Sequence, residues 1–288
     1  MAKLNNEQSG IPLLSDEDFL IMSKFIHEKY GIKIPLTKKV LLETRLRKRI
    51  SELHFSTFTE YREFVFSAKG SDEVIQMIDA VSTNKTEFFR EPHHFDFLVK
   101  TALPDLAVAH GAGIKHPLMV WSAGCSSGEE PYSLAVTISE FSERYPGFPY
   151  EYIILATDIS TKVLDIATRA VYGEDRIEHI PVELRKKYLL RSRDPEKKVV
   201  RIDPMLRDRV RFRRMNLMDD DFGFREPMDI IFCRNVIIYF DAETQEYLMR
   251  KFFNALRKGG FLFLGHSETI QHLSLPFETV APTVYRKK

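Results

Sequence analysis

A glycine-serine loop between an apolar run and a helical pattern constrains the fold of this chain most strongly. The run Pro117-Leu-Met-Val-Trp-Ser122 leads into Ala123-Gly-Cys-Ser-Ser-Gly128, and a helical pattern follows from Pro131 to Arg144. A buried strand, a tight loop and a helix in this order are typical of the first unit of an open α/β sheet. Because ligands of such sheets bind at the carboxyl ends of the strands, we expect this loop to line a binding crevice.

Apolar runs and helical patterns continue to alternate after this loop. The pattern predicts helices over 161–170 and 244–257, with Gly259-Gly260 turning the chain before the last buried strand. It predicts an antiparallel hairpin at the edge of the sheet over 279–286. The further buried strands are predicted at 152–157, 228–233 and 261–265. This rhythm indicates an open, mostly parallel α/β sheet.

The first 80 or so residues have a different character, because only helical patterns occur there. Ser15 followed by three acidic residues is typical of a capped helix start, and Gly31 is a suitable stop. Further helices are predicted over 38–53, 58–67 and 71–81. The chain is therefore expected to begin with a small all-helical domain.

One segment carries a large local charge. Residues 185–214 hold 13 basic and four acidic side chains, a net charge of +9, although the whole chain carries only +1. Within this segment, 198–202 and 209–213 alternate charged with apolar residues, which predicts a small antiparallel insertion with one solvated face. A basic surface of this size favours an acidic partner.

Composition excludes several classes of protein. No apolar run approaches the roughly 20 residues needed to span a bilayer, and the N-terminus lacks the apolar core of a signal peptide. Cys125 and Cys233 are the only cysteines, too few for a disulfide framework or a four-cysteine zinc cluster. The adjacent His93 and His94 should point apart on a helix and chelate poorly, so no metal is predicted, even with His266. We expect a cytoplasmic protein without membrane insertion.

Two glutamates directly after the loop bear on the ligand. Glu129 and Glu130 would repel a phosphate at the helix N-terminus, whereas a ligand with cationic groups suits them. S-adenosylmethionine carries a sulfonium and an ammonium group and no phosphate. Asp158 ends the second strand, where an acidic residue accepts hydrogen bonds from ribose hydroxyls. The alternative is that the glutamates only complement the helix dipole and that Asp158 caps a helix.

Five ordered motifs make the sequence resemble the CheR-type chemotaxis receptor methyltransferases over nearly its whole length. They are Thr83-Asn-Lys-Thr-Glu-Phe-Phe-Arg-Glu91 with His93-His94-Phe95, Gly128-Glu-Glu-Pro-Tyr-Ser133, Ala156-Thr-Asp-Ile159, Phe232-Cys-Arg-Asn-Val-Ile-Ile-Tyr-Phe-Asp241 and Gly265-His-Ser-Glu268. The resemblance implies transfer of a methyl group from S-adenosylmethionine to glutamate side chains of chemoreceptors, leaving S-adenosylhomocysteine.

The resemblance also implies a domain plan. A helical N-terminal domain would span 1–83, and a linker over 84–95 would contribute to the cofactor site. A Rossmann-like methyltransferase domain would span 96–288, with a β-subdomain inserted at about 184–214. The expected partner is the cytoplasmic domain of a chemoreceptor, and the expected state is a monomer.

Matched motif by motif, the resemblance implies the following site. Catalytic roles fall to Arg90 and Tyr239, the two residues nearest the transferred methyl group. The residues expected to bind the cofactor are Asn84, Thr86, Arg90, Glu130, Asp158, Asn216, Leu217, Cys233, Arg234 and Asn235. Asp158 would hold the ribose, Glu130 the amino group, Asn216 and Leu217 the adenine side, and 233–235 the methionine moiety.

The substrate side rests on charge. Lys38, Arg45, Lys48 and Arg49 form a basic face of the second helix that would steer toward an acidic helical substrate, although a solvated face is an equal alternative. For the basic insertion, the resemblance implies a docking site for a receptor C-terminal peptide added as a strand. Peptide-binding members have glycines in its turn, whereas this turn is Arg191-Ser-Arg-Asp-Pro-Glu-Lys-Lys198, so docking there would be lost or altered.

Two other functions compete. The +9 segment would suit a nucleic-acid methyltransferase, but Tyr188 and Phe212 are its only aromatic residues available for base stacking, so no nucleic-acid partner is predicted. Residues 234–237 also lack the Asn/Asp-Pro-Pro-Tyr element of amide and adenine N-methyltransferases. A signalling module that only binds S-adenosylmethionine or its product is the non-enzymatic alternative.

Overall fold

The computed structural model describes residues 10–144, 150–194, 196–271 and 273–288. The chain forms two compact units. The first, here the helical domain, comprises the described residues up to Thr83 together with Tyr239–Asp241. The second, here the sheet domain, comprises Asn84–Ile238 and Ala242–Lys288. Among the described residues, no helix is long and apolar enough to cross a membrane.

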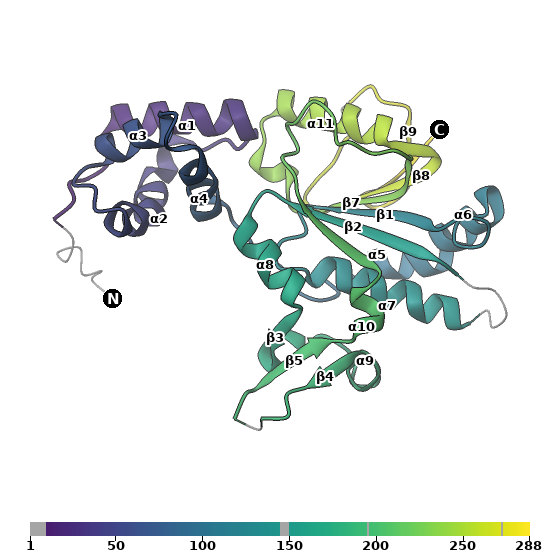
Figure 1. The fold of residues 1–288 in the computed structure, drawn as a ribbon. Coiled ribbons are helices and arrows are strands. Elements are labelled where there is room, and N and C mark those ends of the chain that lie inside the picture. Colours follow the sequence, from purple (N-terminus) through teal and green to yellow (C-terminus); the bar gives the residue numbers. More distant parts are fainter. Residues whose placement is uncertain (1–9, 145–149, 195, 272) are drawn as a thin grey trace. The chain divides into compact units, whose positions relative to one another are not determined.

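The helical domain contains four α-helices along 16–81 (Figure 1). They are α1 (Asp16–Tyr30), α2 (Lys39–Glu52), preceded by the 3-10 turn η1 (Leu36–Lys38), α3 (Phe58–Phe66) and α4 (Ser71–Val81). The predicted ends of α1 are confirmed, because the Ser15 hydroxyl accepts the Asp18 N–H at 3.0 Å and Gly31 adopts φ 72°.

A buried charge cluster links three helices of this domain. The Arg49 guanidinium on α2 holds both oxygens of Glu73 on α4, at 3.0 and 2.5 Å, and the Tyr61 hydroxyl on α3 donates to the same carboxylate at 2.9 Å. Glu73 is buried, so these partners compensate its desolvation. Arg49 therefore has a structural task inside the domain.

The sheet domain is built on a seven-stranded sheet of order β6-β2-β1-β7-β8-β10-β9. The first five strands pair in parallel, and β10 pairs antiparallel with β8 and β9. The strands are β1 (Leu118–Ala123), β2 (Tyr152–Asp158), β6 (Val210–Arg214), β7 (Met228–Cys233), β8 (Leu256–Leu264), β9 (Phe277–Ala281) and β10 (Val284–Lys287). The predicted α/β class with its antiparallel edge is confirmed.

Helices cover both faces of this sheet (Figure 1). α11 (Ala242–Ala255) lies over one face, and α7 (Glu129–Glu143) lies on the other with α5 (Pro92–Phe97). The remaining helical elements are η2 (Leu98–Ala102), α6 (Leu103–His110), α8 (Thr161–Arg169), η3 (Glu174–Ile177), α9 (Val182–Tyr188), α10 (Pro204–Arg207) and η4 (Ile237–Tyr239). Strands β1 and β7 are almost completely buried, as expected for the centre of a sheet covered on both sides.

A separate small sheet has the order β3-β5-β4 and is antiparallel. Its strands are β3 (Val171–Gly173), β4 (Leu189–Arg191) and β5 (Val199–Ile202). The prediction of an antiparallel insertion is confirmed, but its extent of about 184–214 is wrong at both ends. β3 precedes that range, and β6 pairs in parallel with β2 in the main sheet. β6 is an edge strand of the main sheet and is mostly exposed, so it alternates like an antiparallel strand although it pairs in parallel, and periodicity alone could not assign its partner.

The glycine pair near the C-terminus also differs from its prediction. Gly259 and Gly260 lie within β8, which begins at Leu256, and they do not turn the chain before a strand. The pairing of β7 with β8 shifts register between Met228 and Ile230, and Gly259 has φ 78°. A Cβ on Gly260 would lie 2.8 Å from the Asp229 carbonyl oxygen, so the irregularity requires glycine.

Asp229 ties three neighbouring strands together. Its fully buried carboxylate accepts the Met119 N–H of β1 at 2.9 Å and the Nε–H of Arg257 in β8 at 2.8 Å.

Replacing Asp229 with alanine should therefore lower the free energy of unfolding of the sheet domain by about 3 kcal/mol, because a buried N–H and an arginine lose their partner. Urea unfolding of the full chain measures this. Asp165→Ala, at an exposed site on α8, should change stability by less than about 0.5 kcal/mol. Equal stability of the two variants would contradict the assignment.

Candidate active site

The carboxyl ends of β2, β1 and β7 lie next to one another, because these strands are consecutive in the sheet. Ala123 at the end of β1 pairs with Thr157 of β2, and Ser122 pairs with Phe232 of β7. Each strand end is followed by a segment that the sequence singled out: the glycine-serine loop, Asp158 and the run from Cys233. Parallel pairing thus brings three distant motifs to one edge.

The glycine-serine loop has a defined conformation. The N–H groups of Gly124 and Cys125 both donate to the Thr157 carbonyl oxygen, at 2.8 and 2.9 Å. Gly124 has φ 78°, and a Cβ there would lie 2.4 Å from a methyl carbon of Val236. The loop therefore needs glycine at this position, both for the left-handed backbone and for the close approach.

Asp158 fixes the same loop. One of its carboxylate oxygens accepts the Ser126 N–H at 2.8 Å and the other accepts the Ser160 N–H at 2.9 Å. The side chain is buried, at 7% exposure, where the loop and β2 meet. Ser160 in turn caps α8, so the alternative role of Asp158 near a helix start and its role at the loop coexist. A carboxylate oxygen can accept more than one hydrogen bond.

Both glutamates at the start of α7 have arginine partners. Glu130 accepts the Ser122 hydroxyl at 2.7 Å and Nε of Arg234 at 2.7 Å. Glu129 is completely buried and is paired with Ser127 and Arg176. The expectation that bare carboxylates would repel a phosphate is therefore wrong in its premise, because the arginines offset both charges. Glu130 still offers an acceptor at the loop, and this favours a ligand with an N–H or ammonium donor.

Arg234 is the centre of a buried network. Besides Glu130, it donates to the Arg90 carbonyl oxygen at 2.5 Å and lies 3.3 Å from Nδ1 of His94. Its guanidinium also lies 5.5 Å from the ring centroids of Phe95 and Phe232. The side chain is only 2% exposed. We infer that the Arg234 side chain organises the predicted cofactor site, because these partners surround its guanidinium.

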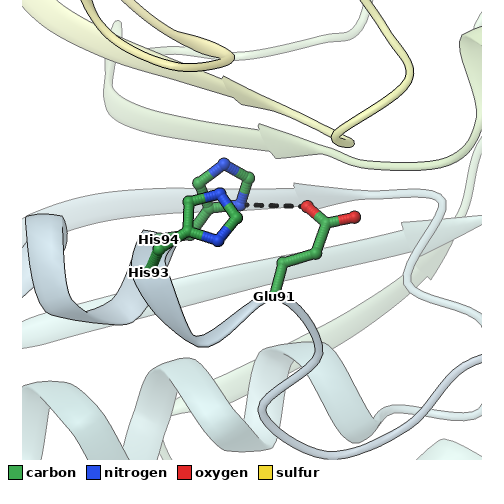
Figure 2. Close-up of side chains that lie close together, drawn as sticks. All are labelled: Glu91, His93 and His94. Carbon is green, nitrogen blue, oxygen red and sulfur yellow. Dashed lines mark ion pairs between the residues drawn. The ribbon is translucent and has the colours of Figure 1, made fainter.

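Glu91, His93 and His94 lie close enough together to be a candidate metal group (Figure 2). Their ligand atoms lie within 4.8 Å of one another, and the two imidazole rings are 4.2 Å apart. The expectation that adjacent histidines point apart is therefore wrong, because both project to the same side of the first turn of α5. However, Arg234 lies 3.6 Å from Glu91 and brings a positive charge to the place of a cation. The absence of a metal stays a prediction.

Asn235 is held in an unusual conformation after β7. It has φ 60°, and its N–H donates to Glu268 at 2.9 Å. The buried Glu268 carboxylate also accepts the Gly265 N–H at 2.6 Å, and burial raises the pKa of this carboxyl. Oδ1 of Asn235 is buried and has no hydrogen-bond partner among the described residues. Such an acceptor favours a ligand donor. The motif containing Glu268 signalled its importance, but its contact with Asn235 could not be predicted.

Asn216 and Leu217 follow β6, the neighbour of β2, so they lie beyond the end of the next strand. The Lys251 ammonium on α11 donates to the Leu217 carbonyl oxygen at 3.1 Å and also to that of Asp219. It lies 4.0 Å from the Phe222 ring centroid, and burial lowers the pKa of this lysine. Lys251 was not predicted as a site residue, because it lies on an ordinary amphipathic helix with no local signal for the contact.

The segment over 84–91 contacts the glycine-serine loop and the start of α7. The Asn84 carbonyl oxygen accepts the Ser126 hydroxyl at 3.0 Å, and the Phe89 N–H donates to Ser133 of α7 at 2.9 Å. Thr86 and Arg90 are half-buried, and Arg90 donates to the Lys85 carbonyl oxygen at 3.3 Å. Phe89 and Glu91 adopt positive φ values of 54° and 56°, strain that surrounding contacts must hold.

The helical domain contains a pocket that unites further predicted residues. Lys38, Arg45 and Tyr239 line it together with Lys33 and Thr83. Arg45 donates to the carbonyl oxygens of Val81 and Ser82, and the Tyr239 carbonyl oxygen accepts the Lys33 N–H at 2.9 Å. The other two predicted substrate residues lie outside this pocket lining: Lys48 is 3.7 Å from Glu52, and Arg49 binds Glu73.

Comparison with known proteins is consistent across the chain. Residues 84–286 match the family model described as CheR methyltransferase, SAM binding domain, and residues 17–82 match CheR methyltransferase, all-alpha domain. A chemotaxis protein methyltransferase of Borreliella burgdorferi is 40% identical over 99% of this chain and 100% of its own length. Chemotaxis protein methyltransferase 2 of Pseudomonas aeruginosa is 38% identical, over 93% of this chain and 92% of its own. The Escherichia coli protein is 35% identical, over 94% and 91%.

His94 provides a test of the buried network through pH. Burial, together with the charge of Arg234, lowers the pKa of His94 to about 3. In the unfolded chain a histidine becomes protonated near pH 6.5, whereas His94 in the folded chain stays neutral at that pH. The free energy of unfolding must therefore fall as the pH drops below about 6.5. The stability advantage of the wild type over His94→Gln should therefore shrink by about 1 kcal/mol between pH 7 and 5.5.

Urea unfolding at the two pH values measures this difference. The pKa of Glu91 is lowered, so its contribution is lost only at more acidic pH and does not interfere. His93→Gln, at the exposed neighbour, should follow the wild-type pH dependence. A constant difference between wild type and His94→Gln would show that His94 protonates normally in the folded protein.

Proposed function

Because the chain belongs to the CheR methyltransferase family, we propose that it methylates glutamate side chains of a chemoreceptor cytoplasmic domain. The chain is an S-adenosylmethionine-dependent chemotaxis protein methyltransferase, as the two family models and the relatives at 35–40% identity show. The observation that carries the proposal is the meeting of the loop, Asp158 and the Arg234–Glu130 pair at one sheet edge, with the family's motifs at all three places.

The residues at this edge suit S-adenosylmethionine. In our proposal Asp158 accepts the ribose hydroxyls, and Glu130 and the unpartnered Oδ1 of Asn235 accept the ammonium group. Asn216 and Leu217 line the adenine side, in a loop that Lys251 holds by its carbonyl oxygens. Asn84, Thr86, Arg90, Cys233 and Arg234 complete the predicted set, with Arg234 acting through Glu130 and the Arg90 carbonyl. A site rich in hydrogen-bond acceptors fits a ligand that carries an ammonium group and hydroxyl groups.

The proposed reaction needs no general base. Bound S-adenosylmethionine supplies an electrophilic methyl group on a sulfonium. A glutamate side chain, with a pKa near 4.3, is already ionised at neutral pH. One of its oxygens would form the bond to the methyl carbon while the carbon–sulfur bond would break and leave its electron pair on sulfur. Arg90 pairs with a carboxylate and Tyr239 donates a hydrogen bond to the acceptor, so that both act by desolvating and orienting it.

For the acceptor, we propose that the pocket lined by Lys38, Arg45 and Tyr239 receives acidic side chains of the receptor helix. Lys48 adds an exposed cation on the same helix, whereas Arg49 belongs to the fold through Glu73. A receptor C-terminal peptide at the small sheet remains a weaker proposal, because its turn lacks the glycines of peptide-binding members. We place the protein in the cytoplasm as a monomer.

The charge of 185–214 gives little support to a nucleic-acid substrate. Lys187 binds Glu140 and Glu143 at 2.6 and 2.5 Å, Arg185 donates to the Ile180 carbonyl oxygen at 2.5 Å, and Arg213 donates to that of Phe222 at 2.5 Å. Some of the basic side chains in this segment therefore bind groups of the protein itself and do not face a phosphate backbone.

A labelling experiment separates the acceptor classes. The protein is incubated with methyl-labelled S-adenosylmethionine and receptor cytoplasmic fragments, and the product is treated with mild alkali. We expect the label to leave as volatile methanol, because alkali hydrolyses methyl esters and spares N-methyl groups. Alkali-stable label, or label only in added RNA, would overturn the glutamate proposal. Cofactor binding without transfer to any substrate would support the non-enzymatic module instead.

Asp158 tests the cofactor site directly. Asp158→Ala should weaken S-adenosylhomocysteine binding by at least about tenfold, because a charged hydrogen-bond partner is lost. Titration calorimetry of the full chain gives the dissociation constant. Asp165→Ala removes a carboxylate from the exposed side of α8 and should bind like the wild type. An unchanged constant in Asp158→Ala would show that the ribose lies elsewhere.

A further inference from the structure

Glu129 has no assigned part in the reaction, yet it is the more deeply buried of the two glutamates at the start of α7. Its side chain is fully buried, whereas that of Glu130 is 10% exposed. Carboxylates are almost never fully buried without a partner, because desolvation of the charge is costly. The nearest residues of its own chain segment provide only one hydrogen bond, from the Ser127 hydroxyl at 2.7 Å. The positive charge that compensates the Glu129 carboxylate comes from a residue outside this segment.

Arg176 supplies that charge from the other side of the loop. It lies on η3, directly after strand β3 of the small sheet, and its guanidinium binds Glu129 and lies 3.5 Å from the Ser127 hydroxyl. The Arg176 side chain is 43% exposed, although the carboxylate that its guanidinium binds is fully buried. One arginine thus contacts both ends of the segment Ser127–Glu129.

Tyr172 of β3 binds the start of the same segment. Its hydroxyl donates to the Ser127 carbonyl oxygen at 2.8 Å, and its buried ring packs against Phe88 at a centroid distance of 5.0 Å. Gly128 between the two contacts has φ 96°, and a Cβ there would lie 2.8 Å from the Tyr172 hydroxyl oxygen. The backbone that enters α7 is therefore shaped by two side chains of the small sheet and its following turn.

From these contacts we propose that Arg176 is a positioning residue for cofactor binding, acting through the buried Glu129. The proposal rests on the placement of the cofactor at the glycine-serine loop. When Arg176 and Tyr172 hold Ser127–Glu129, the loop keeps the conformation in which Ser126 meets Asp158 and Glu130 meets Arg234. Because binding linkage is reciprocal, a bound cofactor must also stabilise η3 and β3. The small sheet and the cofactor loop then form one energetic unit.

A double-mutant cycle on Arg176 and Glu129 tests the proposal, with S-adenosylhomocysteine affinity measured by calorimetry on the full chain. Arg176→Ala should weaken binding about tenfold, since it strands a buried carboxylate in the loop. Arg176→Lys should restore a large part of the affinity. Combining Arg176→Ala with Glu129→Gln should bring the affinity within about twofold of Glu129→Gln alone, because the stranded charge is gone. Arg193→Ala, an exposed arginine in the turn of the small sheet, should bind like the wild type.

Equal affinity of Arg176→Ala and Arg193→Ala would overturn the proposal, and so would additive effects of Arg176→Ala and Glu129→Gln. A wild type that fails to bind S-adenosylhomocysteine would instead refute the cofactor site itself. Hydrogen exchange on the wild type provides a second measurement that needs no variant. The amides of 171–177 should exchange at least about threefold more slowly when S-adenosylhomocysteine is bound. Unchanged exchange there would also overturn the coupling.

Discussion

The buried ion pair between Arg234 and Glu130 is the interaction on which the rest of this site depends. It joins the end of β7 to the start of α7 by a 2.7 Å contact between side chains that are 2% and 10% exposed. Removing two charges from water is costly, and a pair of this kind persists only when further hydrogen bonds complete it. The Ser122 hydroxyl donates a hydrogen bond to Glu130, and the Arg90 carbonyl oxygen accepts one from Arg234. The segment over 84–94 is thereby fixed to the sheet.

This dependence explains why the family motifs are scattered along the sequence. Arg90, Glu130 and Arg234 come from three of the motifs, and Glu268 from a fourth, yet each contacts a neighbour from another motif. A network of charged hydrogen bonds tolerates few substitutions, because loss of one member leaves the others buried and unpaired. Short motifs far apart in the sequence are therefore what a buried network at the carboxyl ends of several strands requires.

The sequence was sufficient for elements whose cause is local. The Ser15 cap, the Gly31 stop and the buried strand over 228–233 follow from hydrogen bonding and apolar patterning within a few residues. Apart from the orientation of the adjacent His93 and His94, the errors concern partners distant in the chain. Nothing in 209–213 states whether the strand pairs in parallel, and nothing near Glu129 names Arg176, 47 residues away. The resemblance supplied site residues by position, but it did not reveal that Arg234 and Glu130 bind each other.

The basic residues show most clearly what the sequence cannot predict. A count of lysines and arginines does not give the surface potential, because it does not show which of them are paired in the fold. Two of the four basic residues predicted on the second helix have partners inside the domain. Arg49 binds the Glu73 carboxylate, and Arg45 donates to backbone carbonyl oxygens. Lys38 and Lys48 are exposed. In 185–214, Lys187 and Arg213 are likewise engaged within the sheet domain. Steering toward an acidic helix depends on cations that face water. The pocket beside Tyr239, where Lys38 lies with a partly committed Arg45, is therefore a better candidate for substrate recognition than either basic run as a whole.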